Sequence, residues 1–357
     1  MFDIAIIGLG PAGAVLASLI DKKYSVICFD LKSGNEDSPF KKPCGGLLAP
    51  DAQKALAGFD IPLPNCILAD PQIFAVKTID LYYKKIRHYQ RMYVNLNRHR
   101  FDIWLKSLIP ENVTVKNQAR CTSVSREKDG FLITVGNNGI NEAFHSKYIV
   151  GADGANSIVR RTFFPKRKIR SYMSIQQWFS EANPIPFYSC IFDPENTDCY
   201  SWTISKDGCF IFGGAYPVKD SRKHFENQKT KLEGIGMKFG KPIKTEACLV
   251  LRPKSRKDFI CGGKGVFLTG EAAGFISPSS LEGISSAIIS ARCLSKAFNS
   301  GENPEKEYKR RTLRLRFKLW FKIIKCPFMY FPPLRFLMMK LGIMKISVLN
   351  ENEKLRF

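Results

Sequence analysis

The chain has 357 residues, of which 45% are hydrophobic and 12% aromatic, so it has enough apolar material for a buried core and is not a disordered sequence. Its 55 basic and 32 acidic residues give a formal net charge of +23, which points to an anionic partner such as nucleic acid, a membrane surface or a phosphorylated substrate. The eleven cysteines contain no C-x-x-C pair, which argues against a disulfide framework or a zinc site and favours the reducing cytoplasm. No uncharged apolar run approaches about 18 residues, so no segment is expected to span a bilayer.

The first thirty residues predict a strand over 3–7, a glycine-rich turn, a helix over 14–22 and a second strand over 25–30. Two later apolar runs that end near glycine, Tyr148–Ala152 and Val266–Gly270, are typical of buried strands and are expected to join the same sheet. Between them, aromatic-rich runs separated by turns predict an antiparallel sheet in a second domain. These runs are Tyr172–Ser180, Phe187–Asp193, Cys199–Ser205 and Cys209–Tyr216.

The glycine-rich turn matches the dinucleotide fingerprint G-x-G-x-x-G between a strand and a helix. Its first glycine permits a tight turn, its second lets the backbone approach a pyrophosphate, and its third lets the helix pack on the strand. The pyrophosphate would lie on the helix N-terminus, where free N–H groups favour anions. An acid at the end of the second strand would bind the ribose hydroxyls. The sequence therefore predicts dinucleotide binding by Gly8, Gly10, Pro11, Ala12, Gly13 and Asp30, and not only a structural turn.

Two further segments indicate which nucleotide is bound. Gly151-Ala152-Asp153-Gly154-Ala155-Asn156-Ser157, followed by Val159-Arg160, resembles the G-A-D-G-x-x-S-x-V-R segment of the p-hydroxybenzoate hydroxylase superfamily. Gly270-Glu271-Ala272-Ala273-Gly274, followed by Glu282-Gly283-Ile284, resembles the later G-D-A-A-G segment of that superfamily. The resemblance implies a Rossmann-type domain that binds FAD non-covalently, with Asp153 and Gly154 among the cofactor-binding residues.

The same resemblance assigns roles around the flavin. The acid of the later segment holds the ribityl chain, and Glu271 stands where the superfamily usually has Asp, which moves the acceptor by one methylene. A helix expected over Leu281–Phe298, with Gly283 and Ile284 near its start, would aim N–H groups at the flavin pyrimidine edge. Arg98 matches the superfamily's R-x-x-F/L-D-x-x-L helix, where the arginine lies close to the cofactor, although an arginine opening an amphipathic helix can also be a solvated charge.

Within the superfamily, Pro43-Cys44-Gly45-Gly46 resembles the P-x-x-C-G/P-C-G-G segment of the geranylgeranyl reductase family. Tyr200-Ser201-Trp202-Thr203-Ile204-Ser205 resembles that family's Y-x-W-x-F-P strand, with Ile204-Ser205 in place of Phe-Pro. The resemblance covers about residues 1–345. It implies that Cys44 and Gly45 lie in a loop beside the flavin.

Three residues are candidates for catalysis. Cys44 could donate a proton or gate the site if its pKa is shifted, whereas a free cysteine is more often a small buried apolar residue. Tyr200 and Trp202 alternate on one strand, so both face the same side. They would line a cavity for a long apolar substrate, or alternatively form half of a domain core.

A basic helix is expected over Glu305–Lys325, with nine Lys or Arg residues in that range. Leu313, Phe317, Trp320, Phe321 and Ile324 recur at helical spacing and form an apolar stripe beneath a cationic face. This pattern is typical of a helix that lies on an anionic membrane surface, and the alternative is a surface helix packed on its own domain.

The resemblance implies an α/β fold, more fully an α+β composite. A discontinuous Rossmann-type FAD-binding domain would comprise 1–75, 95–165 and 255–300. An antiparallel-sheet substrate domain would comprise 76–94 and 166–254, and 301–357 would form a helical C-terminal cap.

The predicted function is FAD-dependent reduction of carbon–carbon double bonds in an isoprenoid or other lipid. The protein would be cytoplasmic and peripheral on the inner face of the membrane. No second G-x-G-x-x-G occurs, so NAD(P)H or a redox protein is expected to supply electrons transiently. Nucleic acid is not an expected partner, because the basic residues lie beside apolar ones. The alternative is a flavin-dependent monooxygenase or halogenase; halogenases carry W-x-W-x-I-P, of which Tyr200, Trp202 and Ile204 are an approximation and Ser205 replaces the proline.

Overall fold

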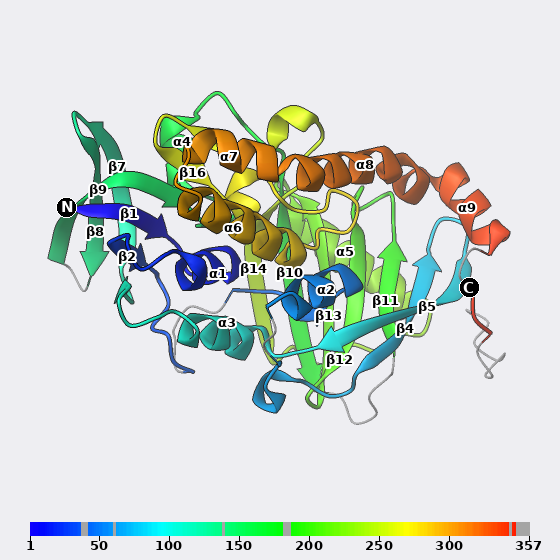
Figure 1. The fold of residues 1–357 in the computed structure, drawn as a ribbon. Coiled ribbons are helices and arrows are strands. Elements are labelled where there is room, and N and C mark those ends of the chain that lie inside the picture. The colour runs from blue at the N-terminus through cyan, green and yellow to red at the C-terminus, as the bar shows by residue number, and fades with distance from the viewer. Residues whose placement is uncertain (37–41, 60–61, 138–139, 181–186, 343–344, 348–357) are drawn as a thin grey trace.

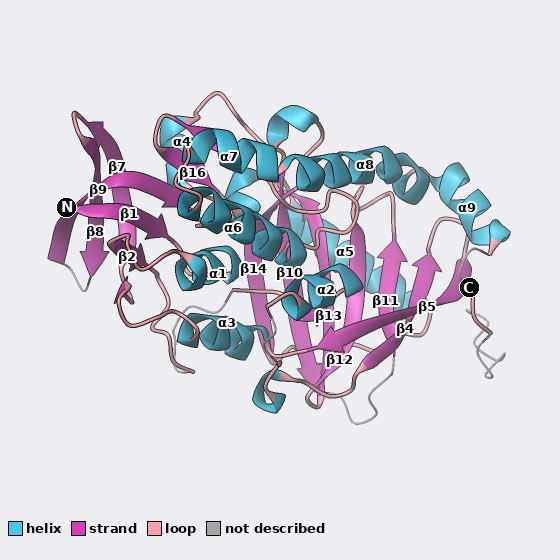
Figure 2. Cartoon of the chain, in the orientation of Figure 1, coloured by secondary structure: helices cyan, strands magenta, loops and turns pink. Residues whose placement is uncertain are grey.

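The computed structural model contains two eight-stranded sheets and several helices (Figure 1). The structure describes residues 1–36, 42–59, 62–137, 140–180, 187–342 and 345–347. Figure 2 shows one sheet near the N-terminus and the other toward the opposite end of the molecule. The α/β fold class predicted from the sequence is confirmed.

The first sheet has a parallel core centred on β1 (Phe2–Ile7). The strand order is β15-β16-β9-β1-β2-β6, and Ile4–Ile7 of β1 are buried. Because β1, β9 and β16 are parallel, the loops that follow them emerge at the same edge of the sheet, where cofactors bind in folds of this kind. The remaining bounds are β2 Val26–Phe29, β6 Thr114–Lys116, β7 Arg120–Glu127, β8 Gly130–Asn137, β9 Ile140–Gly151, β15 Gly262–Gly263 and β16 Val266–Leu268.

The second sheet has the order β14-β10-β13-β12-β11-β4-β5-β3. It departs from the expected antiparallel pattern at one pair, β4 and β11, which run parallel. This is possible because β4 and β11 are separated by a long excursion of the chain through the first sheet, as parallel pairing requires. The bounds are β3 Leu47–Leu48, β4 Ile73–Asp80, β5 Lys85–Asn95, β10 Ser171–Ser180, β11 Phe187–Phe192, β12 Tyr200–Lys206, β13 Cys209–Pro217 and β14 Lys244–Leu251.

The two sheets draw on segments that differ in detail from the predicted domain ranges. β3 and the first residues of β4 lie within 1–75, which the sequence assigned to the cofactor domain, yet they pair in the second sheet. The antiparallel hairpin of β7 and β8 extends the first sheet beside β9. These features arise from pairing between distant strands, which local sequence patterns do not encode.

Helices cover the first sheet and lie between the sheets. α1 (Pro11–Leu19) and α6 (Ile284–Asn299) pack against each other, and α3 (Arg98–Ser107) lies beside α1 (Figure 1). α5 (Ser221–Gly234) packs on the second sheet, where its Phe225 stacks on Phe212 with ring centroids 5.1 Å apart. The other short elements are α2 Pro50–Ala57, α4 Ile158–Phe163 and the 3-10 turns Asn65–Ile67, Arg256–Asp258 and Gly270–Ala273.

The C-terminal region forms three consecutive helices and not the single helix expected over 305–325. These are α7 (Pro304–Arg311), α8 (Leu313–Tyr330) and α9 (Pro332–Leu341). Thr312 separates the first two, and its hydroxyl donates a hydrogen bond to the Tyr308 carbonyl at 2.7 Å. Within the described part of the chain, no helix is both long and apolar enough to cross a bilayer.

Candidate flavin site

The fingerprint glycines have the geometry that dinucleotide binding requires. Gly8 follows β1 at a φ of +94°, and a Cβ there would lie 2.8 Å from the Ala152 carbonyl oxygen. A Cβ on Gly13 would lie 1.9 Å from the Gly8 carbonyl oxygen, so only glycine lets α1 approach the turn. At Gly10, by contrast, a Cβ would meet no described atom within 4 Å. The backbone at Gly10 therefore borders open space, where a pyrophosphate can approach.

The N-terminus of α1 begins at Pro11 and Ala12, and no side chain caps it among the described residues. Gly270 of the later motif packs on it, because a Cβ on Gly270 would lie 2.8 Å from the Ala12 Cβ and 3.5 Å from the Ala287 Cβ. Ala287 belongs to the first turn of α6, whose N-cap is Gly283 and whose N-terminus has no side-chain cap from the part of the chain that the structure describes. Two helix N-termini with available N–H groups thus meet at the carboxyl edge of the first sheet.

Asp30, predicted to bind the ribose, follows β2 and is buried. Its Oδ2 pairs with Lys106 Nζ at 2.8 Å, and Lys106 also donates to the Asn117 side-chain oxygen at 2.8 Å. Lys106 comes from α3 and was not anticipated, because a lone lysine in a helix carries no sequence signal. A ribose contact by Asp30 stays a prediction, and it would be made by a carboxylate that is already oriented by this ion pair.

Glu271, predicted to hold the ribityl chain, is tied to both sides of the site. Its Oε2 pairs with Lys42 Nζ at 2.9 Å, and its Oε1 accepts a hydrogen bond from the Leu251 N–H at 2.9 Å. The charge of Glu271 raises the pKa of Lys42 above its ordinary value, which favours the ammonium form of Lys42. Lys42 is a second residue that the sequence did not single out.

Asp153 and Gly154 follow β9 at the same edge of the sheet. The Asp153 Oδ2 accepts a hydrogen bond from the Ile158 N–H at 2.7 Å, so this carboxylate orients the start of α4. Its Oδ1 is buried without a hydrogen-bond partner among the described residues. Gly154 has a φ of +75°, and a Cβ there would lie 3.8 Å from Lys42 Nζ.

Cys44 lies between two cations. The Gly46 N–H donates to Cys44 Sγ at 3.4 Å, and Arg98 is hydrogen-bonded to the same sulfur. Burial by itself would raise the pKa of the Cys44 thiol, but the charge of Arg98, these hydrogen bonds and the charge of Lys206 together lower it below the ordinary value. The nearby Cys248 lacks this balance, and burial raises its pKa to about 11.

Arg98 is held in place from α3. Asn97 caps that helix by accepting from the His99 and Arg100 N–H groups, and Arg98 Nε donates to Asp102 Oδ1 at 2.9 Å. The second oxygen of Asp102 pairs with Lys32. The Arg98 side chain is therefore only 11% exposed and is oriented by its ion pair with Asp102, so it is not a solvated charge, while a contact with the cofactor stays a prediction.

Lys206 at the end of β12 is a residue that sequence reasoning missed. Its ammonium is buried and donates to the carbonyls of Gly45 at 2.7 Å and Leu96 at 2.6 Å. Burial lowers its pKa to about 8. These hydrogen bonds hold the loop of Cys44–Gly46 against the end of β12, and no role for Lys206 was predicted from the sequence.

Tyr200 and Trp202 lie on one face of β12, as predicted, with ring centroids 6.3 Å apart. The Tyr200 hydroxyl donates to the Ser280 carbonyl at 2.6 Å and so joins the second sheet to the loop before α6. Trp202 packs on Gly213 and on the Gly45 loop, and its indole N–H is buried without a partner among the described residues. A buried unpaired donor beside the Cys44 loop is suited to a bound ligand.

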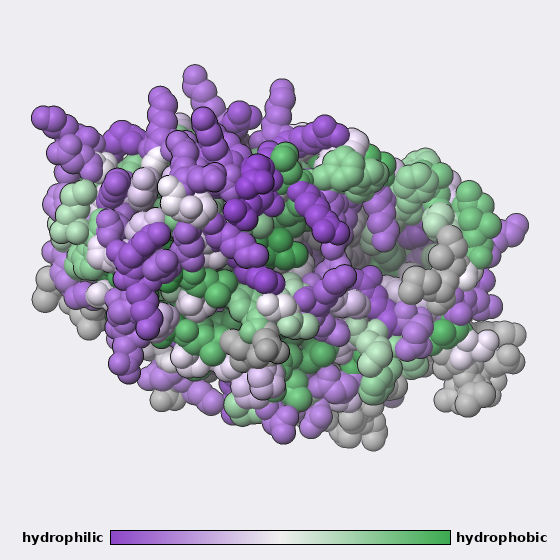
Figure 3. Space-filling model, viewed as in Figure 1, coloured by the Kyte–Doolittle hydropathy of each residue, from purple (hydrophilic) through white to green (hydrophobic). Residues whose placement is uncertain are grey.

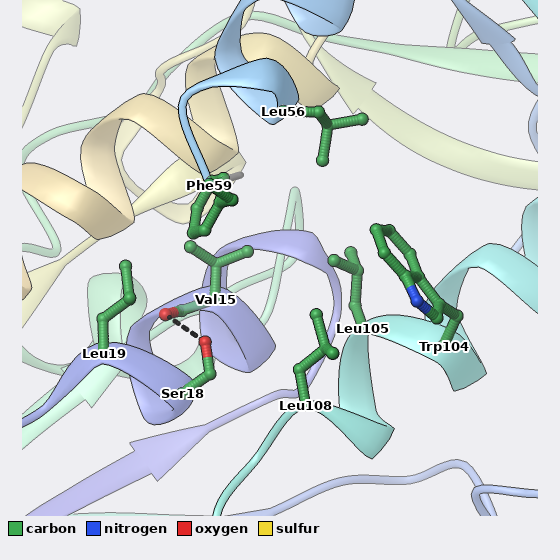
Figure 4. A pocket seen from close by; sticks show the side chains of 8 residues that line it. All are labelled: Val15, Ser18, Leu19, Leu56, Phe59, Trp104, Leu105 and Leu108. Carbon is green, nitrogen blue, oxygen red and sulfur yellow. Dashed lines mark hydrogen bonds between the residues drawn. The ribbon is translucent and has the colours of Figure 1, made fainter. Parts of the chain in front are cut away.

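The cavity drawn in Figure 4 is separate from this site. It has a volume of about 180 Å³ and lies among α1, α2 and α3. Its lining is Val15, Ser18, Leu19, Leu56, Phe59, Trp104, Leu105 and Leu108. None of the predicted cofactor-binding or catalytic residues lines it.

The residues at the sheet edge fit FAD. The open space at Gly10 and the uncapped helix N-termini suit a pyrophosphate and an electron-rich ring edge. In agreement, residues 102–219 match the family model described as an FAD binding domain. The chain is an FAD-dependent oxidoreductase.

Relatives of high sequence identity show which family the chain belongs to. The chain is 50% identical over 351 residues to Protein CbrA of Escherichia coli O6:H1 strain CFT073, which covers 98% of this chain and 96% of that protein. The chain belongs to the CbrA family.

The fold is shared with solved structures of low sequence identity. A geranylgeranyl bacteriochlorophyll reductase-like protein from Thermoplasma acidophilum has a TM-score of 0.76 at 16% identity, covering 95% of this chain and 99% of its own. A variant of the flavin-dependent brominase Bmp2 has a TM-score of 0.71 at 17% identity, covering 96% and 92%. At such identities these likenesses establish the architecture and not the reaction.

Proposed function

We propose that this oxidoreductase reduces carbon–carbon double bonds of an isoprenoid or another apolar lipid. The observation that carries the proposal is the environment of Cys44, a thiol of lowered pKa in the glycine loop against Trp202, between the cations Arg98 and Lys206. Hydride addition to a carbon–carbon double bond leaves the second carbon in need of a proton, which a thiol in a glycine loop against apolar side chains can donate.

The bound flavin would supply a hydride, that is, a proton with two electrons, to one carbon of the double bond. The other carbon needs a proton, and we assign its donation to Cys44 Sγ–H. The S–H bond breaks, a C–H bond forms, and the sulfur keeps the electron pair as a thiolate. Arg98, the Gly46 N–H and Lys206 stabilise that thiolate, which lowers the energy of the transfer.

The chain orients an apolar substrate with aromatic side chains. Tyr93, Tyr188, Tyr200 and Trp202 form one cluster on the inner face of the second sheet. The Tyr93 and Tyr188 rings lie 5.3 Å apart, and the Tyr93 hydroxyl donates to Glu282 Oε1 at 3.2 Å. Tyr93, Tyr188 and Tyr200 are buried, so a prenyl chain that bound against these rings would be shielded from water.

The test uses the FAD-loaded protein, reduced without oxygen and mixed with a bacterial polyprenyl lipid extract. We expect the oxidised flavin spectrum to return and a lipid to gain two hydrogens by mass spectrometry. The C44S variant should bind FAD normally but reoxidise at least about 100-fold more slowly, because general-acid catalysis contributes at least that factor. The C248S variant is the matched control, and it should behave as the wild type.

Two outcomes would overturn the proposal. Reoxidation that needs both substrate and air, with oxygen incorporated in the product, would make the protein a flavin-dependent monooxygenase. Reoxidation by lipid at an unchanged rate in C44S would remove Cys44 as the proton donor.

A further inference from the structure

The outer face of α8 carries a continuous apolar stripe. We call the α8 stripe the set of Leu313, Phe317, Phe321, Ile324, Phe328 and Phe331. At about 100° per residue the five positions within α8 fall within an arc of about 80° on the helix surface, and Phe331 follows directly after the helix as its C-cap. Phe317, Phe321 and Phe331 remain 55%, 49% and 56% exposed.

The stripe is not needed to hold α8 on the protein. The opposite face supplies that contact through Leu315 and Leu319, which are buried in the main core. Trp320, which the sequence placed in the stripe, is instead partly buried against that core, with the Arg256 guanidinium 3.7 Å from its ring centroid. The exposed rings therefore face solvent, while the opposite face of α8 holds the helix on the protein.

Basic side chains border the stripe along its length. Arg314, Lys318 and Lys325 are exposed and lie on α8 next to the apolar positions, and Lys340 and Lys345 extend the series beyond it. Figure 3 shows hydrophobic side chains gathered over α8 and α9, with hydrophilic ones over α7. Lys318 also pairs with Asp51 at 2.9 Å across a half-exposed contact. The combination of exposed aromatic and aliphatic groups with adjacent cations matches the headgroup region of an anionic bilayer.

We propose that the α8 stripe and the start of α9 dock on an anionic phospholipid bilayer, with the helix axis in the plane of the membrane. The rings enter the boundary between headgroups and acyl chains, and Arg314, Lys318 and Lys325 contact the phosphates. This inference does not depend on the reaction proposed above, because it concerns where the protein binds and not what it reduces.

The end of the docking helix also reaches the aromatic cluster. Phe328 and Phe331 are exposed, whereas Met329 and Tyr330 between them pack against the buried cluster that includes Tyr200. The Tyr330 hydroxyl donates to the Ser279 carbonyl at 2.6 Å, in the loop that leads to α6. One helix turn therefore has the membrane on one side and the cluster on the other. An apolar lipid that leaves the bilayer at this turn would meet that cluster first.

α9 is fixed rigidly enough to keep this surface in place. Arg335 of α9 makes a bidentate ion pair with Asp80 at the end of β4, with distances of 2.8 and 3.2 Å. Both side chains are buried, and the Arg335 guanidinium also lies 4.7 Å from the Phe192 ring centroid. The docking surface is consequently part of the folded body and needs no ordering on binding.

The experiment is co-sedimentation of the FAD-loaded full chain with vesicles of phosphatidylcholine containing 30% phosphatidylglycerol. We expect binding that weakens about 100-fold in pure phosphatidylcholine vesicles and falls as salt is raised, because several cations contribute near the surface. The triple variant F317S/F321S/I324S should lose at least about 30-fold in partitioning. It should keep its flavin spectrum and melting temperature, since these side chains are exposed.

The matched control is F74S/I243S, which removes two apolar side chains of similar exposure away from α8. It should bind vesicles as the wild type does. Equal vesicle binding by the triple variant and the wild type would overturn the proposal. The proposal would also fail if the wild type formed a dimer in sedimentation that did not bind vesicles and the triple variant abolished that dimer. The stripe would then be an interface between two copies of this chain.

Discussion

Replacing Gly10 by alanine should weaken FAD binding without weakening the fold. Gly10 has a φ of −71° and a ψ of −171°, which alanine adopts without strain, and an added Cβ would meet no described atom within 4 Å. Loss of backbone freedom in the unfolded chain should stabilise the apoprotein by about 0.4–1 kcal/mol. The same Cβ would occupy the space through which the pyrophosphate approaches, so we expect the Kd for FAD to rise at least about 100-fold, or about 2.7 kcal/mol.

Gly13 provides the opposite case. An alanine Cβ there would lie 1.9 Å from the Gly8 carbonyl oxygen, so the backbone must move, and the apoprotein should lose about 1–3 kcal/mol or more. Gly234, at the end of α5, is the control position with open space and no cofactor nearby. G234A should leave FAD binding unchanged.

The assay pairs two measurements on each variant. Urea unfolding of the apoprotein gives the free energy of unfolding, and quenching of flavin fluorescence gives the Kd. Wild-type FAD affinity in G10A would refute the placement of the pyrophosphate. A loss of stability in G10A as large as that in G13A would refute the reading that the space at Gly10 is open.

Three further outcomes follow from the same contacts. R98Q should raise the pKa of the Cys44 thiol and slow its alkylation at pH 7 about tenfold for each unit of pKa increase, measured by peptide-mapping mass spectrometry. In the wild type, alkylation of Cys44 should rise with pH through a midpoint below that of an ordinary thiol. Cys248, with its pKa of about 11, should stay unreactive in the same experiment. D80A should cost about 3–5 kcal/mol in urea unfolding by leaving Arg335 buried and unpaired, and adding R335M should restore most of it; a D80A protein as stable as the wild type would contradict the buried pair. Removing FAD should lower the free energy of unfolding by about 2.7 kcal/mol relative to protein with FAD at 100 times its Kd, seen as a lower Tm, and an unchanged Tm would mean that the folded state does not bind it.

The sheet edge was predictable because each of its motifs is local. The residues of each glycine-rich segment carry their own constraint: a turn, a close approach or a helix start. Short apolar runs lead into Gly8, Gly151 and Gly270 at the ends of β1, β9 and β16, and parallel pairing brings these ends to one edge. The four aromatic runs of the second domain likewise match β10 to β13.

The polar partners could not be predicted, because they are single residues from distant segments. Lys206 is one lysine at the end of a strand, and its burial against the Gly45 and Leu96 carbonyls depends on tertiary packing. Which side of α8 packs on the core could not be predicted either. Leu315 and Leu319 follow a helical period just as Leu313 and Phe317 do, so periodicity shows two apolar faces and not which one packs on the core.

At Glu271, one methylene more than in the usual aspartate changes which groups the carboxylate of this motif contacts. Its carboxylate spans from the Lys42 ammonium to the Leu251 N–H, and Leu251 ends β14 of the second sheet. An aspartate would bring its carboxylate closer to the backbone by that methylene, and it could not keep both contacts without a shift of the chain. The glutamate therefore ties the flavin motif of the first sheet to the second sheet and to the segment that leads into Cys44. Any ribityl contact it makes is coupled, through Lys42, to the position of the proposed proton donor two residues away.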